Sequence, residues 1–292
     1  MTEFVLQEPA RAIFHTPFYA AMARGDFLRE GVEVRLAIGG ESGAALASLV
    51  SGEADLGWAE PMEVIRTLAE DPDSALVCFG AAAVGDPFFL VGRGVNSSFV
   101  LSDLASLRLG TVSRMPTPWW CLGRDLRQAG LDPESLRRST GRDMADTLAA
   151  VMTNEIDVAL LPEPFASLAE QAGGAVWHAA ARRGPTAYSA FCATRDRIAA
   201  RPMEMSAMLQ GLVSVQAWLA QAPAVEVSAT VASFFPDLAP PVLTTAIARY
   251  QGLRIWAADP AFPRDAFERL QAAMLEAGAI AAAPGYETCV IT

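Results

Sequence analysis

Lysine is absent from this sequence of 292 residues, in which all 22 basic residues are arginine. Without a lysine, the chain can form no internal Schiff base with a carbonyl substrate or pyridoxal phosphate, and it lacks a P-loop lysine. Histidine is scarce as well, because the chain contains only His15 and His178. General bases are therefore few, and these shortages argue against an enzyme.

Cysteine is also rare, and the four residues Cys78, Cys121, Cys192 and Cys289 lie far apart. The absence of CxxC or CxxxC spacing excludes a sequence-local zinc or redox motif and leaves disulfides undecided. We expect no metal site and no cofactor.

The overall charge is strongly acidic, at −11. Nucleic acids and anionic membrane surfaces bind basic patches, so neither is an expected partner. No apolar run reaches the length of a membrane span, and the first residues lack the basic stretch and long apolar core of a signal peptide. We therefore expect no membrane insertion, and either a cytoplasmic chain or the mature form of an exported one.

A pattern that occurs twice organises the chain. Residues 40–63 and 141–167 each begin with glycine, a spacer and a helix-capping residue. Each continues with apolar residues at helical spacing and turns at Asp55 or Asp157 into a short apolar strand that ends in Glu-Pro. The alternative is two unrelated βαβα segments with similar capping residues, but the shared register favours one duplicated unit.

Four expected helix starts carry capping residues, namely Thr16, Ser42, Thr117 and Asp143. Thr16 and Thr117 are each followed by a proline at the expected first helical position and by an aromatic pair. The duplicated unit therefore reads strand, capped helix, strand, capped helix, strand.

Two Gly/Pro breaks, at residues 85–87 and 184–186, bracket the second copy. We interpret them as hinge crossings between two α/β lobes. Residues 86–185 would form lobe 2, inserted into a lobe 1 made of residues 1–85 and 186–292.

The character of the chain changes after residue 195. No strand signal returns before residues 288–291, and we interpret this part as a helical completion of lobe 1. Amphipathic helices are expected at residues 202–220, 224–234, 241–252 and 264–279.

Two such lobes leave a cleft, and ligands of α/β proteins bind beyond the carboxyl ends of the strands, where helix N-termini point. Helix capping alone would explain each Ser and Thr at these positions equally well. His15 has a simpler interpretation as a hydrogen-bonded loop residue, and Glu163 as a residue that shapes a turn. Trp218 and Trp256 are expected in the core. The expected ligand-binding residues are His15, Thr16, Tyr19, Gly40, Ser42, Trp58, Glu60, Arg114, Thr117, Trp119, Arg142, Glu163 and Tyr188.

Three segments carry a resemblance to a known family. They read AMARGDF continuing to EGVEV at residues 21–34, GEADLG at 52–57 and DVALLPEP at 157–164. Over residues 5–195 the chain is similar to the periplasmic substrate-binding proteins for nitrate, sulfonates, taurine and thiamine pyrimidine precursors. The resemblance implies a type II periplasmic-binding-protein fold that closes on a small solute and delivers it to an ABC permease.

The chain departs from that family in lacking an export signal and lysine. The same fold includes enzymes, such as menaquinone-pathway dehydratases, pyrimidine synthases that use a pyridoxal phosphate lysine, and a sulfinate desulfinase with a nucleophilic cysteine after the first strand. This chain has no lysine, which a pyrimidine synthase needs. It reads QEPAR at residues 7–11, so it also lacks the cysteine that the desulfinase needs after the first strand.

We therefore expect a monomeric solute-binding protein that captures a small heteroaromatic or zwitterionic molecule for an ABC-type importer. Arginine forks suit an acidic group, and paired glutamates suit an amine or ring N–H. A periplasmic location follows if an export signal has been removed. The alternative is a cytoplasmic enzyme acting on a small aromatic or pyrimidine-like metabolite. Its reactive group would be His15 or Cys121, the latter in the first turn of a helix, where the dipole lowers a thiol pKa.

Overall fold

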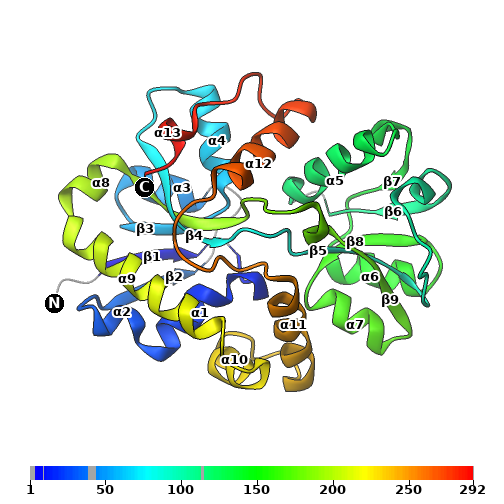
Figure 1. Ribbon diagram of the computed structural model, residues 1–292, viewed down its shortest axis with the longest axis horizontal. Coiled ribbons are helices and arrows are strands. Elements are labelled where there is room, and N and C mark those ends of the chain that lie inside the picture. Colours follow the sequence, from blue (N-terminus) through cyan, green and yellow to red (C-terminus); the bar gives the residue numbers. More distant parts are fainter. Residues whose placement is uncertain (1–3, 9, 39–43, 113–114, 292) are drawn as a thin grey trace.

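The computed structural model describes residues 4–8, 10–38, 44–112 and 115–291. Its strands are β1 (Phe4–Glu8), β2 (Val34–Ile38), β3 (Leu56–Ala59), β4 (Leu76–Ala83), β5 (Phe88–Arg93), β6 (Arg108–Gly110), β7 (Arg137–Ser139), β8 (Val158–Pro162), β9 (Gly174–Ala179) and β10 (Ser189–Thr194). They form two five-stranded sheets, in the orders β2-β1-β3-β10-β4 and β7-β6-β8-β5-β9, which lie side by side as two lobes (Figure 1).

Each sheet has the same plan. In the first, β1 pairs in parallel with β2 and β3, and β10 pairs antiparallel with β3 and β4. In the second, β6 pairs in parallel with β7 and β8, and β5 pairs antiparallel with β8 and β9. The chain thus passes from one sheet to the other between β4 and β5 and returns before β10. The lobe boundaries themselves, at residues 85/86 and 185/186, stay a prediction.

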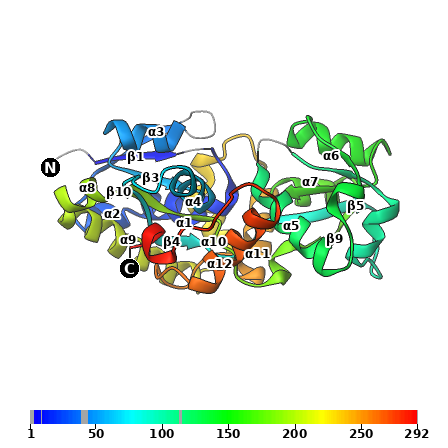
Figure 2. The same ribbon diagram turned by 90° about the horizontal axis from the view of Figure 1, so that it is seen from above.

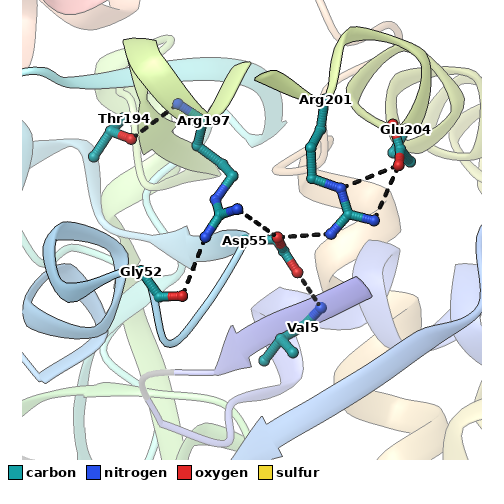
Figure 3. Close-up of polar contacts among 7 residues, drawn as sticks. All are labelled: Val5, Gly52, Asp55, Thr194, Arg197, Arg201 and Glu204. Atoms are coloured by element: carbon teal, nitrogen blue, oxygen red, sulfur yellow. Dashed lines mark hydrogen bonds and ion pairs between the residues drawn. The ribbon is translucent and has the colours of Figure 1, made fainter. Parts of the chain in front are cut away.

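The duplicated unit makes the same backbone contact in both lobes. The Asp55 carboxylate accepts a hydrogen bond from the Val5 N–H at 2.8 Å, and the Asp55 N–H donates to the Val5 carbonyl at 2.9 Å (Figure 3). Asp157 exchanges the same two bonds with Arg108, at 2.8 and 2.9 Å. This shared geometry supports one duplicated unit over two unrelated segments.

The helices cover the faces of both sheets (Figure 2). The α-helices are α1 (Thr16–Arg24), α2 (Asp26–Arg29), α3 (Ala44–Ser51), α4 (Pro61–Glu70), α5 (Pro116–Gln128), α6 (Met144–Met152), α7 (Phe165–Gln171), α8 (Arg195–Ala200), α9 (Pro202–Leu219), α10 (Ala224–Val231), α11 (Pro240–Leu253), α12 (Arg264–Glu276) and α13 (Tyr286–Cys289). The 3-10 helices are η1 (Ile13–His15), η2 (Leu101–Ser106), η3 (Pro133–Ser135), η4 (Ala180–Arg183) and η5 (Ala232–Phe234). No described helix is both long and apolar enough to cross a membrane.

The predicted N-caps at Thr16 and Thr117 are wrong. The 3-10 helix η1 runs directly into α1, so Thr16 is already helical and its hydroxyl donates to the Ile13 carbonyl at 2.6 Å. Helix α5 begins one residue before Thr117, because Pro116 has a backbone φ suited to the first helical position.

Two other helix ends depend on local residues. Asp143 caps α6 and accepts a hydrogen bond from the Asp146 N–H at 2.8 Å, as predicted. Gly25 ends α1 in the left-handed conformation, with a φ of 71° that favours glycine. Ser42 lies outside the described residues.

The chain after residue 195 is helical, with α9 to α12 close to the predicted ranges. The strand predicted at residues 288–291 is wrong, since α13 occupies the first half of it and only Val290 forms a bridge, to Cys78. Helix α11 packs against α7, and α12 against α5, so this part contacts both lobes (Figure 1). It is therefore more than a completion of lobe 1.

Candidate functional site

Two buried rings with unpaired nitrogens lie near the carboxyl ends of β1 and β3. His15 is 3% exposed and Trp58 is fully buried, with ring centroids 6.1 Å apart. Neither ring nitrogen of His15, nor Trp58 Nε1, forms a hydrogen bond with any residue that the structure describes. Burial lowers the pKa of His15 to about 3, and a weak contact with the Ala10 backbone opposes this only in part, so the imidazole is neutral at pH 7. A buried polar atom without a hydrogen-bond partner lowers the stability of the folded protein. A ligand that supplies the missing hydrogen bonds would remove this penalty, which makes both rings candidate ligand contacts.

Glu60 links the two lobes at the same edge of the sheets. It follows β3 directly, is half-buried, and its Oε2 accepts a hydrogen bond from the Thr117 hydroxyl of α5 at 3.1 Å. Burial, together with the neighbouring Glu63, raises the pKa of Glu60 to about 7, and the Thr117 bond opposes the shift. Among the described side chains, no arginine forms an ion pair with Glu60. A ligand N–H or cation at this carboxylate would supply the missing partner.

Thr111 is a candidate that the sequence analysis missed. It directly follows β6, is 3% exposed, and its hydroxyl is unpaired within the described parts of the chain. The duplicated unit contains the signal that could have identified it. Val5 and Arg108 occupy matching places, so Thr111 in lobe 2 corresponds to Glu8 in lobe 1, and both stand where a ligand is expected.

The hydroxyl of Tyr19 is already bonded within lobe 1. It donates to Glu8 Oε1 at 2.5 Å, and the same carboxylate accepts two further bonds from Arg11. Both aromatic rings of this pair, Phe18 and Tyr19, are fully buried. Phe18 stacks on Trp58 with centroids 4.8 Å apart, so this pair packs within the core of lobe 1.

Glu163 is held inside the protein. Its Oε1 accepts hydrogen bonds from Arg249 at 2.6 Å and from the Ser167 hydroxyl at 3.0 Å, while its Oε2 accepts one from the Ser167 N–H at 3.0 Å. Burial raises the pKa of Glu163, and the Arg249 guanidinium opposes that shift. The carboxylate therefore ties the end of β8 to α11.

Three further candidates form no hydrogen bond or ring contact with His15, Trp58 or Glu60 in the described chain. The guanidinium of Arg138 covers the Trp119 ring at 4.1 Å from its centroid, and Arg142 binds Ser139 and Glu155. Tyr188 is 1% exposed. Gly40, Ser42 and Arg114 lie outside the described residues. A ligand-binding role for any of the thirteen predicted residues remains a prediction.

The thiol of Cys121 is unsuited to nucleophilic catalysis. It lies in the second turn of α5, is 2% exposed, and burial raises its pKa to about 12. The predicted lowering of its pKa is wrong because desolvation outweighs the helix dipole. All four cysteines are free and buried, and no group of three or more metal-ligating side chains occurs among the described residues.

The sequence matches a known protein family. A family model described as NMT1/THI5 like matches residues 13–224. The chain belongs to the NMT1/THI5-like family. This confirms the family resemblance drawn from the sequence motifs, because the match spans most of both duplicated units.

A relative of this NMT1/THI5-like protein is "Putative binding protein YtlA" of Bacillus subtilis, 24% identical over 285 residues, which cover 95% of this chain and 84% of that protein. The periplasmic aliphatic sulphonate-binding protein SsuA of Escherichia coli has a similar structure, with a TM-score of 0.80 and 17% identity over 99% of this chain and 92% of that one. The desulfurization enzyme DSZB is similar as well, with a TM-score of 0.71 and 12% identity over 98% of this chain and 96% of that one. These similarities confirm the type II periplasmic-binding-protein fold.

Proposed function

We propose that this protein binds a small organic solute between its two lobes and delivers it to an ABC-type importer. The observation that carries the proposal is a set of buried or half-buried polar groups at or near strand ends of both sheets that are unpaired or poorly paired, namely His15, Trp58, Glu60 and Thr111. Such groups line small-molecule sites, where a few polar atoms orient a ligand in apolar surroundings. The names of YtlA and SsuA, both binding proteins, support the same class.

The site favours a ligand with an N–H group or a positive charge. Burial and the neighbouring Glu63 raise the pKa of Glu60 to about 7, so a ligand cation there would stabilise the ionised form. The neutral imidazole of His15 offers one donor and one acceptor, and Trp58 Nε1 offers a donor. These groups match the edge of a heteroaromatic ring or a zwitterion better than they match a bare inorganic anion.

An acidic group on the ligand would meet Arg114, which precedes α5 by two residues, and this part of the proposal rests on its position in the sequence. Transport further requires an exported, periplasmic chain that acts as a monomer and contacts a permease. Those points are proposals that follow from the family.

An enzyme on the same fold is the second candidate, and the similarity to DSZB favours it. The buried Cys121 thiol argues against a cysteine nucleophile, and the low pKa of His15 argues against an imidazole that carries a proton at pH 7. The imidazole could still accept a proton weakly, so the two classes differ most clearly in the fate of the ligand.

Native mass spectrometry of freshly purified protein would identify a retained small molecule. Calorimetry with that compound should then show weaker binding by roughly 1–3 kcal/mol for His15→Gln and for Glu60→Gln. The matched control is Glu134→Gln, since Glu134 is exposed in η3 and should leave the affinity unchanged. Equal affinity in all three variants would place the site elsewhere.

The ligand should also close the lobes. X-ray scattering should show a smaller radius of gyration in the bound form, and ligand at about a hundred times its dissociation constant should add roughly 2.7 kcal/mol to the free energy of unfolding. A binding protein returns the compound unchanged after denaturation. Recovery of an altered compound would replace the transport function by an enzymatic one.

A further inference from the structure

A cavity lies at the joint between the lobes, and its lining differs from the residues of the proposed ligand site. Its volume is about 240 Å³, and its walls come from α5, from η4 just before the return crossing, and from α12. None of the residues assigned above to the ligand site lines it. Helix α12 packs on α4 of the first lobe and on α5 of the second, so the cavity has walls from both lobes (Figure 1).

Arginine dominates the lining, with Arg124, Arg182, Arg183 and Arg269. Arg183 is nearly buried and forms ion pairs with Asp86 and Asp125, and Arg124 pairs with Glu276. Those three carboxylates face four guanidinium groups, so the balance of charge around the cavity is positive in a chain whose net charge is −11.

Two of the four arginines have no acidic partner in the described chain. Arg269 donates one hydrogen bond from Nε, to the Pro185 carbonyl at 2.7 Å, and its terminal nitrogens form no ion pair there. Arg182 is exposed and forms neither a hydrogen bond nor an ion pair with a described residue. A guanidinium presents its terminal N–H groups as a fork that matches the oxygens of an oxyanion.

Neutral donors complete the lining. Gln128 of α5 contributes an amide, and His178 of β9 contributes an imidazole. The volume lies below the range of about 300–1,000 Å³ that is usual for drug-sized ligands, which favours a small occupant.

We propose that this cavity binds a small tetrahedral oxyanion, inorganic phosphate or the phosphate group of a small ester, between Arg182 and Arg269. Bound there, the anion would bridge η4 and α12 and would hold the joint of the lobes in the arrangement described. The site is independent of the proposed solute cleft, so either can fail without the other.

Thermal unfolding in sodium phosphate and in sodium chloride at equal ionic strength tests the proposal, because matching the ionic strength removes the general screening effect of salt. Phosphate should raise the melting temperature of the unchanged protein above its value in chloride. Arg182→Gln and Arg269→Gln should each weaken phosphate binding about tenfold, which corresponds to losing one charge-assisted hydrogen bond of about 1.4 kcal/mol.

Arg137→Gln is the matched control, because Arg137 lies on β7, is exposed, forms no ion pair with a described residue and does not line the cavity. It should change phosphate binding less than twofold. Arg269→Gln also removes the bond to Pro185 and could lower the basal stability, whereas Arg182→Gln removes no such contact and decides the test. No phosphate-specific stabilisation, or an equal loss in all three variants, would overturn the proposal. Calorimetry with glycerol 3-phosphate distinguishes an ester from the free anion, since tighter binding than inorganic phosphate indicates the ester.

Discussion

At the scale of single residues, Glu60 gives the protein a pH dependence whose sign the structure determines. Its pKa is about 7 when folded, against 4.5 for the free group. An acid with a raised pKa binds its proton more tightly in the folded state. Its favourable contribution is therefore fully present below pH 4.5 and is lost as the pH rises through 7.

The prediction is that Glu60→Gln removes about 1–3 kcal/mol of the fall in unfolding free energy between pH 5 and pH 8. Urea unfolding at a series of pH values measures it. Glu134→Gln, an exposed glutamate in η3, is the control and should retain the full slope of the unchanged protein. The idea fails if the slopes of the two variants agree.

The buried Glu163 carboxylate makes a second residue-scale prediction. Replacing it by Ala leaves Arg249 beside an emptied site and should cost about 3 kcal/mol of unfolding free energy. Glu170 pairs with the same arginine at 2.5 Å, but its side chain is 39% exposed, so Glu170→Ala should cost less than about 1 kcal/mol. Chemical denaturation of both variants compares them, and equal losses would contradict the structural role assigned to Glu163.

At the scale of the elements, the duplicated aspartates provide a built-in comparison. Asp55 and Asp157 accept the same backbone N–H, but Asp55 also forms an ion pair with Arg201 at 2.7 Å, and Arg197 approaches it at 3.5 Å (Figure 3). Its side chain is 8% exposed, against 22% for Asp157, whose ion pair is with Arg108.

We expect Asp55→Ala to cost about 2–3 kcal/mol and Asp157→Ala about 1 kcal/mol, because both lose the strand contact but Asp55 is the more buried carboxylate and also loses its ion pair with Arg201. Equilibrium unfolding measures the difference, and a larger loss at Asp157 would contradict it.

Arg108 lowers the pKa of Asp157 to about 2 from 3.8, so the stability that this ion pair contributes is present above pH 3.8 and is lost as the pH falls to 2.

At the scale of the whole molecule, the second lobe has most of an apolar core of its own, which bears on whether it can fold alone. Most of the residues in two apolar clusters lie between β5 and η4, including Leu109, Leu122 and Val158. One face of β5 instead packs on α11, where the Phe89 and Tyr250 rings stack 6.1 Å apart.

Residues 86–185 expressed alone should therefore fold, but with lower stability than within the full chain, because α11 is missing. A dispersed NMR spectrum and a cooperative unfolding transition would agree with this. A spectrum of an unfolded chain would show that α11 is required and that the proposed lobe boundaries are incomplete.

The sequence by itself determined the duplicated unit, the helix end at Gly25, the cap at Asp143 and the helical character of the last third of the chain. These features depend on neighbouring residues, because glycine at positive φ, capping side chains and apolar periodicity act within a few positions. The family could be identified for the same reason, since its motifs are turns and strand ends.

The tertiary structure alone decided which polar groups remain unpaired. Glu163 and Tyr19 have sequence neighbourhoods as suited to a ligand as that of Glu60. Arg249, however, lies 86 residues from Glu163, and Glu8 at the end of β1 accepts a hydrogen bond from the Tyr19 hydroxyl of α1. Burial likewise raised the pKa of the Cys121 thiol that helix position was expected to lower. The hydrogen-bond partner of a side chain, or the residues that bury it, can come from a segment far away in the sequence. The spacing of neighbouring residues therefore does not predict them.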